Sequence, residues 1–313
     1  MSYLGLDVGG TRCRYEWYPA GTVGGGEADG VQPAVHGIER TAQELAEVIA
    51  FAQQHQRAEA VVCAVAGAGD PSTASAIVAG LELHGVTAPV AVVGDVLAAA
   101  AAGLAGGPGV VIWSGTGSFA IARGADGKLW RVGGRGYLFG DHGSGFDLVR
   151  RAVTAAVLSL DGLGPDTALL PALTEAFAAP SPQRLGATAQ RLTPREIAAR
   201  APIVLQACAA GDAVAVLVAE EAAAALETLG RAACGRASLH GELCEHTLAL
   251  GGGVLTGSPV LAELLRERIT RSGASPRVQV LDALAAARGA AWLAHGWHQG
   301  IEPQHGWVDD VAI

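Results

Sequence analysis

The sequence Tyr3-Leu4-Gly5-Leu6-Asp7-Val8-Gly9-Gly10-Thr11 joins an apolar run to a glycine-rich turn, and we call residues 7–11 the first turn. A second turn, Ser114-Gly115-Thr116-Gly117-Ser118, follows another apolar run much later in the chain. Strand-like sequence resumes after each turn. Because glycine has no Cβ, backbone N–H groups there can approach an anion closely, and the neighbouring hydroxyls add donors. Two such turns facing each other would hold a polyphosphate from both sides.

The composition is that of an ordinary globular enzyme. The chain has 313 residues, of which 50% are hydrophobic and 16% charged, so it is long enough for two domains. Its alanine-rich stretches are interrupted by Gly, Glu or Asp before they reach the length of a membrane span, about 18 residues. The start of the chain lacks a signal-peptide pattern, which favours a cytoplasmic location. The formal net charge of −9 disfavours nucleic acid as a partner. A nucleotide ligand would need Mg²⁺ to offset this negative field.

The cysteines do not form a disulfide pattern. They are five in number and scattered, which is typical of reduced core residues: Cys13, Cys63, Cys208, Cys234 and Cys244. His240, Cys244 and His246 lie close together in sequence and suggest zinc ligands. They supply only three ligands, from a mixed loop and strand, so a zinc site is the weaker hypothesis here.

Lysine is almost absent from the chain. Lys128 is its only lysine, in a predicted hairpin turn, and no G-x-x-x-x-G-K-[ST] sequence occurs. The protein is therefore not a P-loop NTPase, and a protein-kinase lysine is excluded by the same count. Any phosphate site must use backbone amides, hydroxyls, metal and possible arginine contacts.

Both halves of the chain predict strands interleaved with helices. In the first half we expect strands over 3–7, 13–18, 60–65 and 89–93, a further strand after 21–26, and helices over 39–55 and 73–81. In the second half we expect strands over 110–113, 119–123, 247–250 and 277–281, and helices over 146–160, 213–234, 259–271 and 283–295. The Pro/Ala-rich region 165–202 has no clear pattern. Strands with interleaved helices imply mixed sheets with helices on their faces.

A boundary is expected at Gly106-Gly107-Pro108. It divides the chain into an N-terminal lobe, 1–107, and a C-terminal lobe, 108–313. The last helix, about 283–298, is expected to pack back near the hinge.

Together these motifs resemble the actin/hexokinase/heat-shock-ATPase superfamily. Within it the chain is most similar to the BadF/BadG/BcrA/BcrD-type ATPase family, in its N-acetylglucosamine and glucosamine kinase branch. The resemblance covers nearly the whole chain, and its most specific part is residues 133–144, similar to the branch's G-G-x-G-x-x-x-G-D-E-G-S. It implies a two-lobed actin-like ATPase fold (ribonuclease H-like), an α/β fold in which each lobe is a mixed sheet flanked by helices.

The resemblance also implies roles for particular residues. Asp95 would be the general base that accepts the proton of the attacking hydroxyl, and Asp7 would orient Mg²⁺ through water. The ATP phosphates would be bound by Gly9, Gly10, Thr11, Gly115, Thr116 and Gly117. Adenosine would lie on Gly251, Gly252 and Gly253, and the sugar on Asp141, Gly134, Thr116 and His36. A structural alternative for Asp95 is the N-cap of the helix that starts at Val96.

Three positions depart from the branch pattern. His142 stands where the branch carries Glu, and residues 30–37 lack the Asn that relatives offer to the sugar, so Gln32 or His36 is the candidate replacement. Arg135 lies where some relatives have an aromatic residue; it is either a contact for an acidic substrate group or a surface arginine.

The sequence thus predicts an ATP-dependent kinase for N-acetylglucosamine or glucosamine, with ATP and Mg²⁺ as cofactors and the 6-hydroxyl as acceptor. A homodimer is expected from relatives. One alternative is a BadF-type ATPase that activates a reductase or dehydratase through an iron–sulfur cluster, but no cysteine lies in a glycine-flanked cluster motif. Another is a sugar sensor on the same fold; a catalytically dead sensor would be expected to lose Asp7 or Asp95, and both remain.

Overall fold

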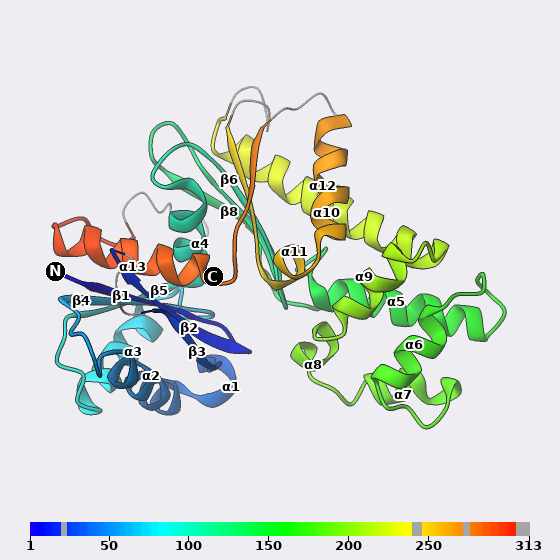
Figure 1. Ribbon diagram of the computed structural model, residues 1–313, viewed down its shortest axis with the longest axis horizontal. Helices are drawn as coiled ribbons and strands as arrows, with labels where there is room; N and C mark the ends of the chain where they lie inside the picture. Colours follow the sequence, from blue (N-terminus) through cyan, green and yellow to red (C-terminus); the bar gives the residue numbers. More distant parts are fainter. Residues whose placement is uncertain (20–23, 240–245, 272–275, 305–313) are drawn as a thin grey trace. The chain divides into compact units, whose positions relative to one another are not determined.

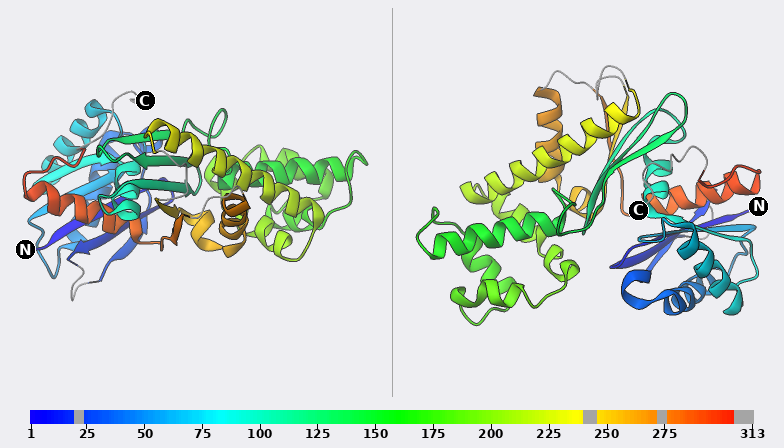
Figure 2. Two further views of the ribbon diagram at one scale, coloured as in Figure 1. Left: turned by 90° about the horizontal axis from the view of Figure 1, so that it is seen from above. Right: turned by 180° about the vertical axis from the view of Figure 1, so that it is seen from behind.

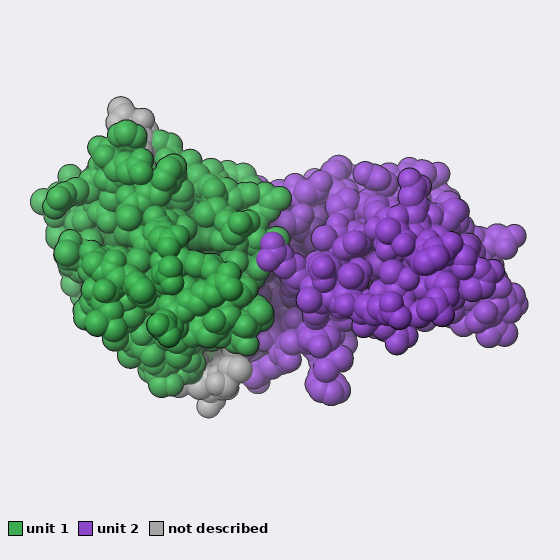
Figure 3. Space-filling model, turned by 90° about the horizontal axis from the view of Figure 1, so that it is seen from below, with its two compact units in different colours: residues 1–107, 125–130, 282–313 green, residues 108–124, 131–281 purple. Residues whose placement is uncertain are grey.

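The computed structural model describes residues 1–19, 24–239, 246–271 and 276–304 (Figure 1). The chain divides into two compact units, each with its own five-stranded sheet. Unit 1 comprises residues 1–107, 125–130 and 282–313, and unit 2 comprises residues 108–124 and 131–281 (Figure 3).

The sheet of unit 1 is mixed, with strand order β3-β2-β1-β4-β5. Its strands are β1 (Tyr3–Val8), β2 (Arg12–Tyr18), β3 (Gly26–Asp29), β4 (Ala60–Val65) and β5 (Val90–Gly94). β1 pairs antiparallel with β2 and parallel with β4, and β5 continues the parallel part. β4 is buried along its whole length, as its continuous apolar sequence predicts. The carboxyl ends of β1, β4 and β5 therefore meet at one edge of the sheet.

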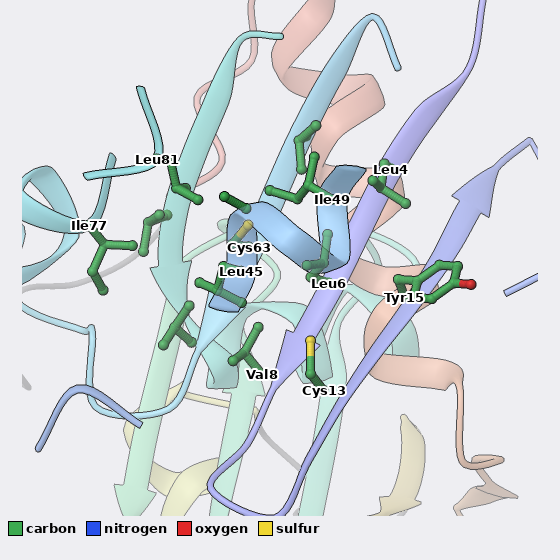
Figure 4. Close-up of a cluster of buried hydrophobic side chains, with 14 of the residues drawn as sticks. Leu4, Leu6, Val8, Cys13, Tyr15, Leu45, Ile49, Cys63, Ile77 and Leu81 are labelled. Carbon is green, nitrogen blue, oxygen red and sulfur yellow. The ribbon is translucent and has the colours of Figure 1, made fainter. Parts of the chain in front are cut away.

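Helices cover both faces of this sheet (Figure 1). On one face, α2 (Ile38–Ala52) and α3 (Pro71–Leu83) bury Leu45, Ile49, Ile77 and Leu81 against Leu6 of β1 (Figure 4). α3 begins where sequence rules place it, because the Asp70 side chain accepts the Thr73 N–H at 2.8 Å and proline follows the cap. A short helix, α1 (Pro33–His36), precedes α2.

The other face carries α4 (Asp95–Leu104) and α13 (Ala285–His298), which pack on each other and on β1. These contacts are made backbone to backbone. A Cβ at Gly5 would lie 2.0 Å from the Ala291 nitrogen, and one at Gly289 would lie 2.1 Å from the Ala98 oxygen. Glycine is thus needed where α13 meets β1 and where it meets α4.

The sheet of unit 2 is also mixed, with strand order β10-β9-β6-β7-β8. Its strands are β6 (Gly109–Ser114), β7 (Ser118–Arg123), β8 (Leu129–Gly133), β9 (Thr247–Gly251) and β10 (Arg277–Val280). β6 runs parallel to β9 and antiparallel to β7. The long helix α10 (Ala213–Arg236) packs on β6 and β7, and α12 (Pro259–Arg271) packs on α10 (Figure 2). Both sheets match the predicted mixed sheets flanked by helices, whereas β8 is a strand that the sequence did not predict.

The Pro/Ala-rich region forms short helices that pack with α5 (Gly145–Leu160). They are α6 (Leu169–Ala176), the single 3₁₀ turn η1 (Pro182–Arg184), α7 (Leu185–Ala189), α8 (Pro194–Ala198) and α9 (Ala201–Ala209). α8 starts with a complete capping box, in which Thr193 and Glu196 bond each other's backbone N–H groups. In this region, proline therefore occupies the first turn of several helices rather than a loop.

In the described part of the chain, no single helix combines the length and apolar character needed to cross a membrane. The helices in Pro194–Ala209 and Ala213–Arg236 meet that test only as a pair, bent by 119°. Cys13, Cys63, Cys208 and Cys234 are buried and form no disulfide, as predicted, and Cys244 lies outside the described residues.

Candidate active site

The first turn, in unit 1, lies at the carboxyl end of β1. The Gly9 N–H donates to the Arg12 oxygen at 3.0 Å and closes the turn. Neither Gly9 nor Gly10 has a positive φ, and a Cβ at Gly9 would meet only the Arg12 oxygen, at 3.5 Å. The packing of this turn therefore does not require glycine at position 9. Thr11 completes the turn and is partly exposed.

Asp7 and Asp95 lie at the same edge of the unit 1 sheet. Asp7 is near the end of β1 and Asp95 directly follows β5, two strands away, which corresponds to about 10 Å. The pKa of Asp7 is raised to about 7, first by desolvation and then by the charge of Asp95, while Arg14 lowers it. Asp7 as a whole residue is partly exposed.

Asp95 is the first residue of α4 and not its N-cap. The N-cap is Gly94, which makes no side-chain cap bond, and the Asp95 Oδ1 accepts the N–H of its neighbour Val96 at 3.1 Å. The N-cap alternative for Asp95 is therefore wrong.

The loop after β3 brings Gln32 to the first turn. A Cβ at Gly10 would lie 3.0 Å from the Gln32 Oε1, so this side chain lies directly beside the turn. The Gln32 N–H donates to the His36 Nδ1 at 3.1 Å. One ring nitrogen of His36 is thus engaged by the main chain, and only Nε2 is left to contact a ligand.

The second turn, in unit 2, joins β6 to β7. Its Gly115 N–H donates to the Gly117 oxygen at 2.8 Å, and Thr116 at its tip is exposed. The flanking Ser114 and Ser118 are buried, and their hydroxyls donate inward to the carbonyl oxygens of Gly143 and His142, both at 2.8 Å. Of the three hydroxyls in this turn, the exposed one belongs to Thr116.

Asp141 belongs to a loop that lies against the second turn; we call residues 133–144 the Asp141 loop. A Cβ at Gly117 would lie 2.8 Å from the Asp141 Oδ2, and the backbone N–H groups of Gly136 and Ser118 lower the pKa of this carboxyl. Its Oδ1 is buried and has no hydrogen-bond partner among the described residues. Leaving a buried oxygen without a partner is costly, so Oδ1 is a candidate acceptor for a donor group of a ligand.

The pKa of Asp141 is raised above its ordinary value. Desolvation is the main cause, and the backbone N–H groups of Gly136 and Ser118 and the positive charge of Arg131 only partly oppose it. Arg131, on β8, is 7% exposed, and its guanidinium carbon would lie 3.8 Å from a Cβ at Gly134. Gly134 has a φ of +67°, a conformation that glycine adopts readily and that would strain a residue with a Cβ. The side chain of His142 is exposed.

The triple glycine 251–253 ends β9 and starts α11 (Gly253–Gly257). A Cβ at Gly251 would lie 2.5 Å from the Trp113 ring, and one at Gly252 would lie 2.4 Å from the Ser114 oxygen. Packing therefore explains these two glycines. A Cβ at Gly253 would meet nothing within 4 Å, so this position is open to a ligand.

Several residues near these positions were not singled out from the sequence. Arg14 lies directly across from Asp7, Arg131 lowers the pKa of Asp141, and the Ser118 hydroxyl donates to the His142 oxygen. A lone arginine in a strand is usually a surface residue. The alternation of side chains along a strand, which puts Arg14 on the Asp7 face, is a signal that could have identified it.

Of the three predicted zinc ligands, His240 and Cys244 lie outside the described residues, and His246 lies within them. Within the described part of the chain, no group of three or more His, Cys, Asp or Glu side chains could hold a metal ion. Asp7 has the chemistry for a hydrated Mg²⁺: it is a carboxylate whose burial and acidic neighbour favour a nearby cation.

Comparison with solved structures identifies the class. A protein from Chromobacterium violaceum, provisionally named an N-acetylglucosamine kinase, has 25% identity and a TM-score of 0.73, over 93% of this chain and 98% of that one. A ROK family glucokinase from Streptomyces griseus, solved with glucose and AMPPNP, has 20% identity and a TM-score of 0.62, over 95% and 100% of the two chains. The fold is therefore the two-lobed fold of the actin-like ATPases and sugar kinases.

The sequence identifies the family within this class. Residues 4–294 match the BadF/BadG/BcrA/BcrD ATPase family, and the chain belongs to it. An N-acetylmuramic acid/N-acetylglucosamine kinase of Clostridium acetobutylicum is 29% identical over 73% of this chain and 74% of its own length. An N-acetyl-D-glucosamine kinase of Dictyostelium discoideum is 28% identical over 68% and 67%, respectively. The family resemblance drawn from the motifs is thereby confirmed.

Proposed function

We infer that this chain is an ATP-dependent sugar kinase, and we propose that it phosphorylates an amino sugar, N-acetylglucosamine or glucosamine, at the 6-hydroxyl. The observation that carries the proposal is the buried Asp141 Oδ1. It has no hydrogen-bond partner among the described residues, and its carboxylate lies against Gly117 of the second turn. A hydroxyl acceptor beside a phosphate-binding turn is what transfer from a nucleotide to a sugar requires.

Asp95 is the proposed general base. The sugar hydroxyl attacks the γ-phosphorus of ATP, its proton passes to the Asp95 carboxylate, and ADP leaves with the electrons of the broken P–O bond. Asp95 suits this role because it follows β5 at the edge that also carries the first turn. Its negative charge is felt at Asp7, so the two carboxylates act in one electrostatic environment.

Mg²⁺ is the proposed cofactor besides ATP. When bound, it would neutralise the charge that develops on the phosphate oxygens. Asp7 would hold it through water, which fits a carboxylate whose pKa is raised by burial and by a second carboxylate.

The remaining roles follow the two turns and the loop. Backbone N–H groups of Gly9, Gly10, Gly115 and Gly117 and the hydroxyls of Thr11 and Thr116 would bind the phosphates. Gly253 leaves room for adenosine next to Gly251 and Gly252. Asp141 would accept sugar hydroxyls, with Gly134, Thr116 and the Nε2 of His36 as further contacts. A homodimer and a cytoplasmic location stay predictions.

A coupled ADP-release assay with Mg-ATP tests the proposal. The panel comprises N-acetylglucosamine, glucosamine, N-acetylmuramic acid, N-acetylmannosamine and glucose. We expect turnover that depends on an amino sugar, and a KM for that sugar that rises strongly in Asp141→Asn. ATP hydrolysis indifferent to every sugar would instead favour an activator ATPase, and nucleotide binding without turnover would favour a sensor.

A further inference from the structure

We propose that Ser118, although it belongs to the second turn, is a positioning residue for the sugar: its hydroxyl holds the Asp141 loop in the conformation that presents the Asp141 carboxylate. This inference rests on the proposed function. It assigns to a serine of a phosphate-binding turn a role on the acceptor side of the reaction.

Ser118 contacts the Asp141 loop at three points. Its hydroxyl donates to the His142 oxygen at 2.8 Å, and its carbonyl oxygen accepts the Gly134 N–H at 2.9 Å. Its own backbone N–H lowers the pKa of the Asp141 carboxyl. One residue of the second turn thus bonds the beginning of the loop and residue 142, and its N–H favours the charge of the functional side chain between them.

The hydroxyl of Ser118 is directed into the protein. The residue is 1% exposed, and its hydroxyl proton is committed to the His142 oxygen. A hydroxyl has a single proton to donate, so this bond and donation to a phosphate oxygen exclude each other. Exposed Thr116 is the residue of this turn whose hydroxyl can reach a ligand without breaking such a bond.

The loop needs this support because its backbone is strained. Asp141 has a φ of +53°, a left-handed backbone conformation that residues other than glycine rarely adopt. The segment that follows is held on both sides. The Gly143 oxygen accepts the buried Ser114 hydroxyl, and the Gly143 N–H donates to the Asp147 Oδ2 at 3.0 Å. Ser118 supplies the matching support at position 142, next to Asp141 itself.

The Ser118→Ala variant distinguishes a role of the hydroxyl in positioning Asp141 from a role in binding phosphate. If the hydroxyl positions Asp141, the KM for the sugar rises roughly tenfold, as expected for one lost buried hydrogen bond, while the KM for ATP stays within about threefold. If the hydroxyl binds phosphate, the KM for ATP rises and the KM for the sugar does not. That pattern, or unchanged values for both substrates, would overturn the proposal.

A double-mutant cycle with Asp141→Asn tests whether Ser118 acts through Asp141. Sugar dissociation constants are measured by calorimetry for wild type, both single variants and the double variant. We expect Ser118→Ala to weaken sugar binding by no more than about twofold when Asp141→Asn is already present. Additive effects would mean that Ser118 acts independently of Asp141 and would contradict the proposal.

Thr167→Val is the matched control for general destabilisation of unit 2. The Thr167 hydroxyl donates to the Asp212 Oδ1 at 2.9 Å, and this bond lies outside the second turn and the Asp141 loop. Thr167→Val should lower the melting temperature without changing the KM of either substrate. If it raises the sugar KM as much as Ser118→Ala does, the effect is one of stability and the proposal is wrong.

Hydrogen exchange on the wild-type protein gives a result that needs no variant. Sugar alone, without nucleotide, should slow exchange in residues 114–118 as well as in the Asp141 loop, because Ser118 joins them. Protection confined to the loop would contradict the proposal. A wild-type protein that neither binds nor phosphorylates any amino sugar would instead refute the proposed function, so the two failures are distinguishable.

Discussion

Arg14 lies directly opposite Asp7 on the neighbouring strands β1 and β2, and Glu27 lies opposite Arg14 on β3. The three side chains form a row of alternating charge across the sheet. The Arg14 Nε donates to the Glu27 Oε2 at 2.9 Å, which fixes the guanidinium near Asp7. Arg14 lowers the pKa of Asp7, whereas burial and Asp95 raise it. The arginine thus helps to keep the proposed metal-orienting carboxylate ionised.

Replacing Arg14 by leucine should weaken Mg²⁺ binding at neutral pH. Without the guanidinium the pKa of Asp7 rises above about 7, so more of the carboxylate is protonated. We expect the Mg²⁺ concentration for half-maximal activity to be several-fold higher in this variant than in wild type at pH 7. The difference between variant and wild type should be smaller at pH 9. Arg12→Leu is the control, because Arg12 also pairs with Glu27 but does not shift the pKa of Asp7. An equal effect in both variants would contradict this role.

Asp7→Asn should stabilise the protein at alkaline pH in the absence of divalent cations. The folded-state pKa of Asp7 is about 7, above its ordinary value of 3.8. A raised pKa means that the carboxyl favours folding when protonated, and this contribution is lost as pH rises from about 3.8 to about 7. At pH 8 the ionised group therefore costs up to a few kcal/mol, which the amide avoids.

Thermal unfolding as a function of pH measures this effect. The melting temperature of Asp7→Asn should exceed that of wild type at pH 8, and the difference should vanish near pH 4. Asp29→Asn, at an exposed position of the same unit, should show no such trend. A variant less stable than wild type at pH 8 would show that Asp7 is not desolvated as described.

Two glycines of α13 should respond oppositely to alanine. A Cβ at Gly289 would lie 2.1 Å from the Ala98 oxygen, so Gly289→Ala forces α13 away from α4 and should cost roughly 3 kcal/mol or more. A Cβ at Gly296 would meet only Ile301, at 3.9 Å, and alanine favours helix by about 0.5–1 kcal/mol. Chemical denaturation of both variants checks the pair. Equal stability of the two would contradict the close packing of α4 and α13.

The sequence predicted the fold best where a single local pattern determined the structure. The apolar run 60–65 is the buried strand β4, and the two turns follow β1 and β6 as expected. It predicted no elements over 165–202, where no clear pattern was found, although Pro194 occupies the first helical position of α8. Such short helices are stabilised by tertiary packing, and a local sequence pattern does not show that packing directly.

The candidate site divides in the same way. Motifs identified the turns, Asp95 and Asp141 because glycines and acids at fixed spacings are local features. Arg131 and the inward hydroxyl of Ser118 were not predicted, since their roles arise from contacts between segments separated in sequence. Asp95 was open to a capping interpretation until the structure gave that position to Gly94.

The most direct test of the proposed kinase reaction is to follow the γ-phosphoryl group of ATP into its product. ATP labelled with ¹⁸O in the γ-phosphoryl group is incubated with enzyme, Mg²⁺ and N-acetylglucosamine or glucosamine, and the products are analysed by mass spectrometry. We predict label in a sugar 6-phosphate, and a transfer rate at least about a hundredfold lower in Asp95→Asn, with sugar binding retained. Label found only in inorganic phosphate, or undiminished transfer by Asp95→Asn, would contradict it.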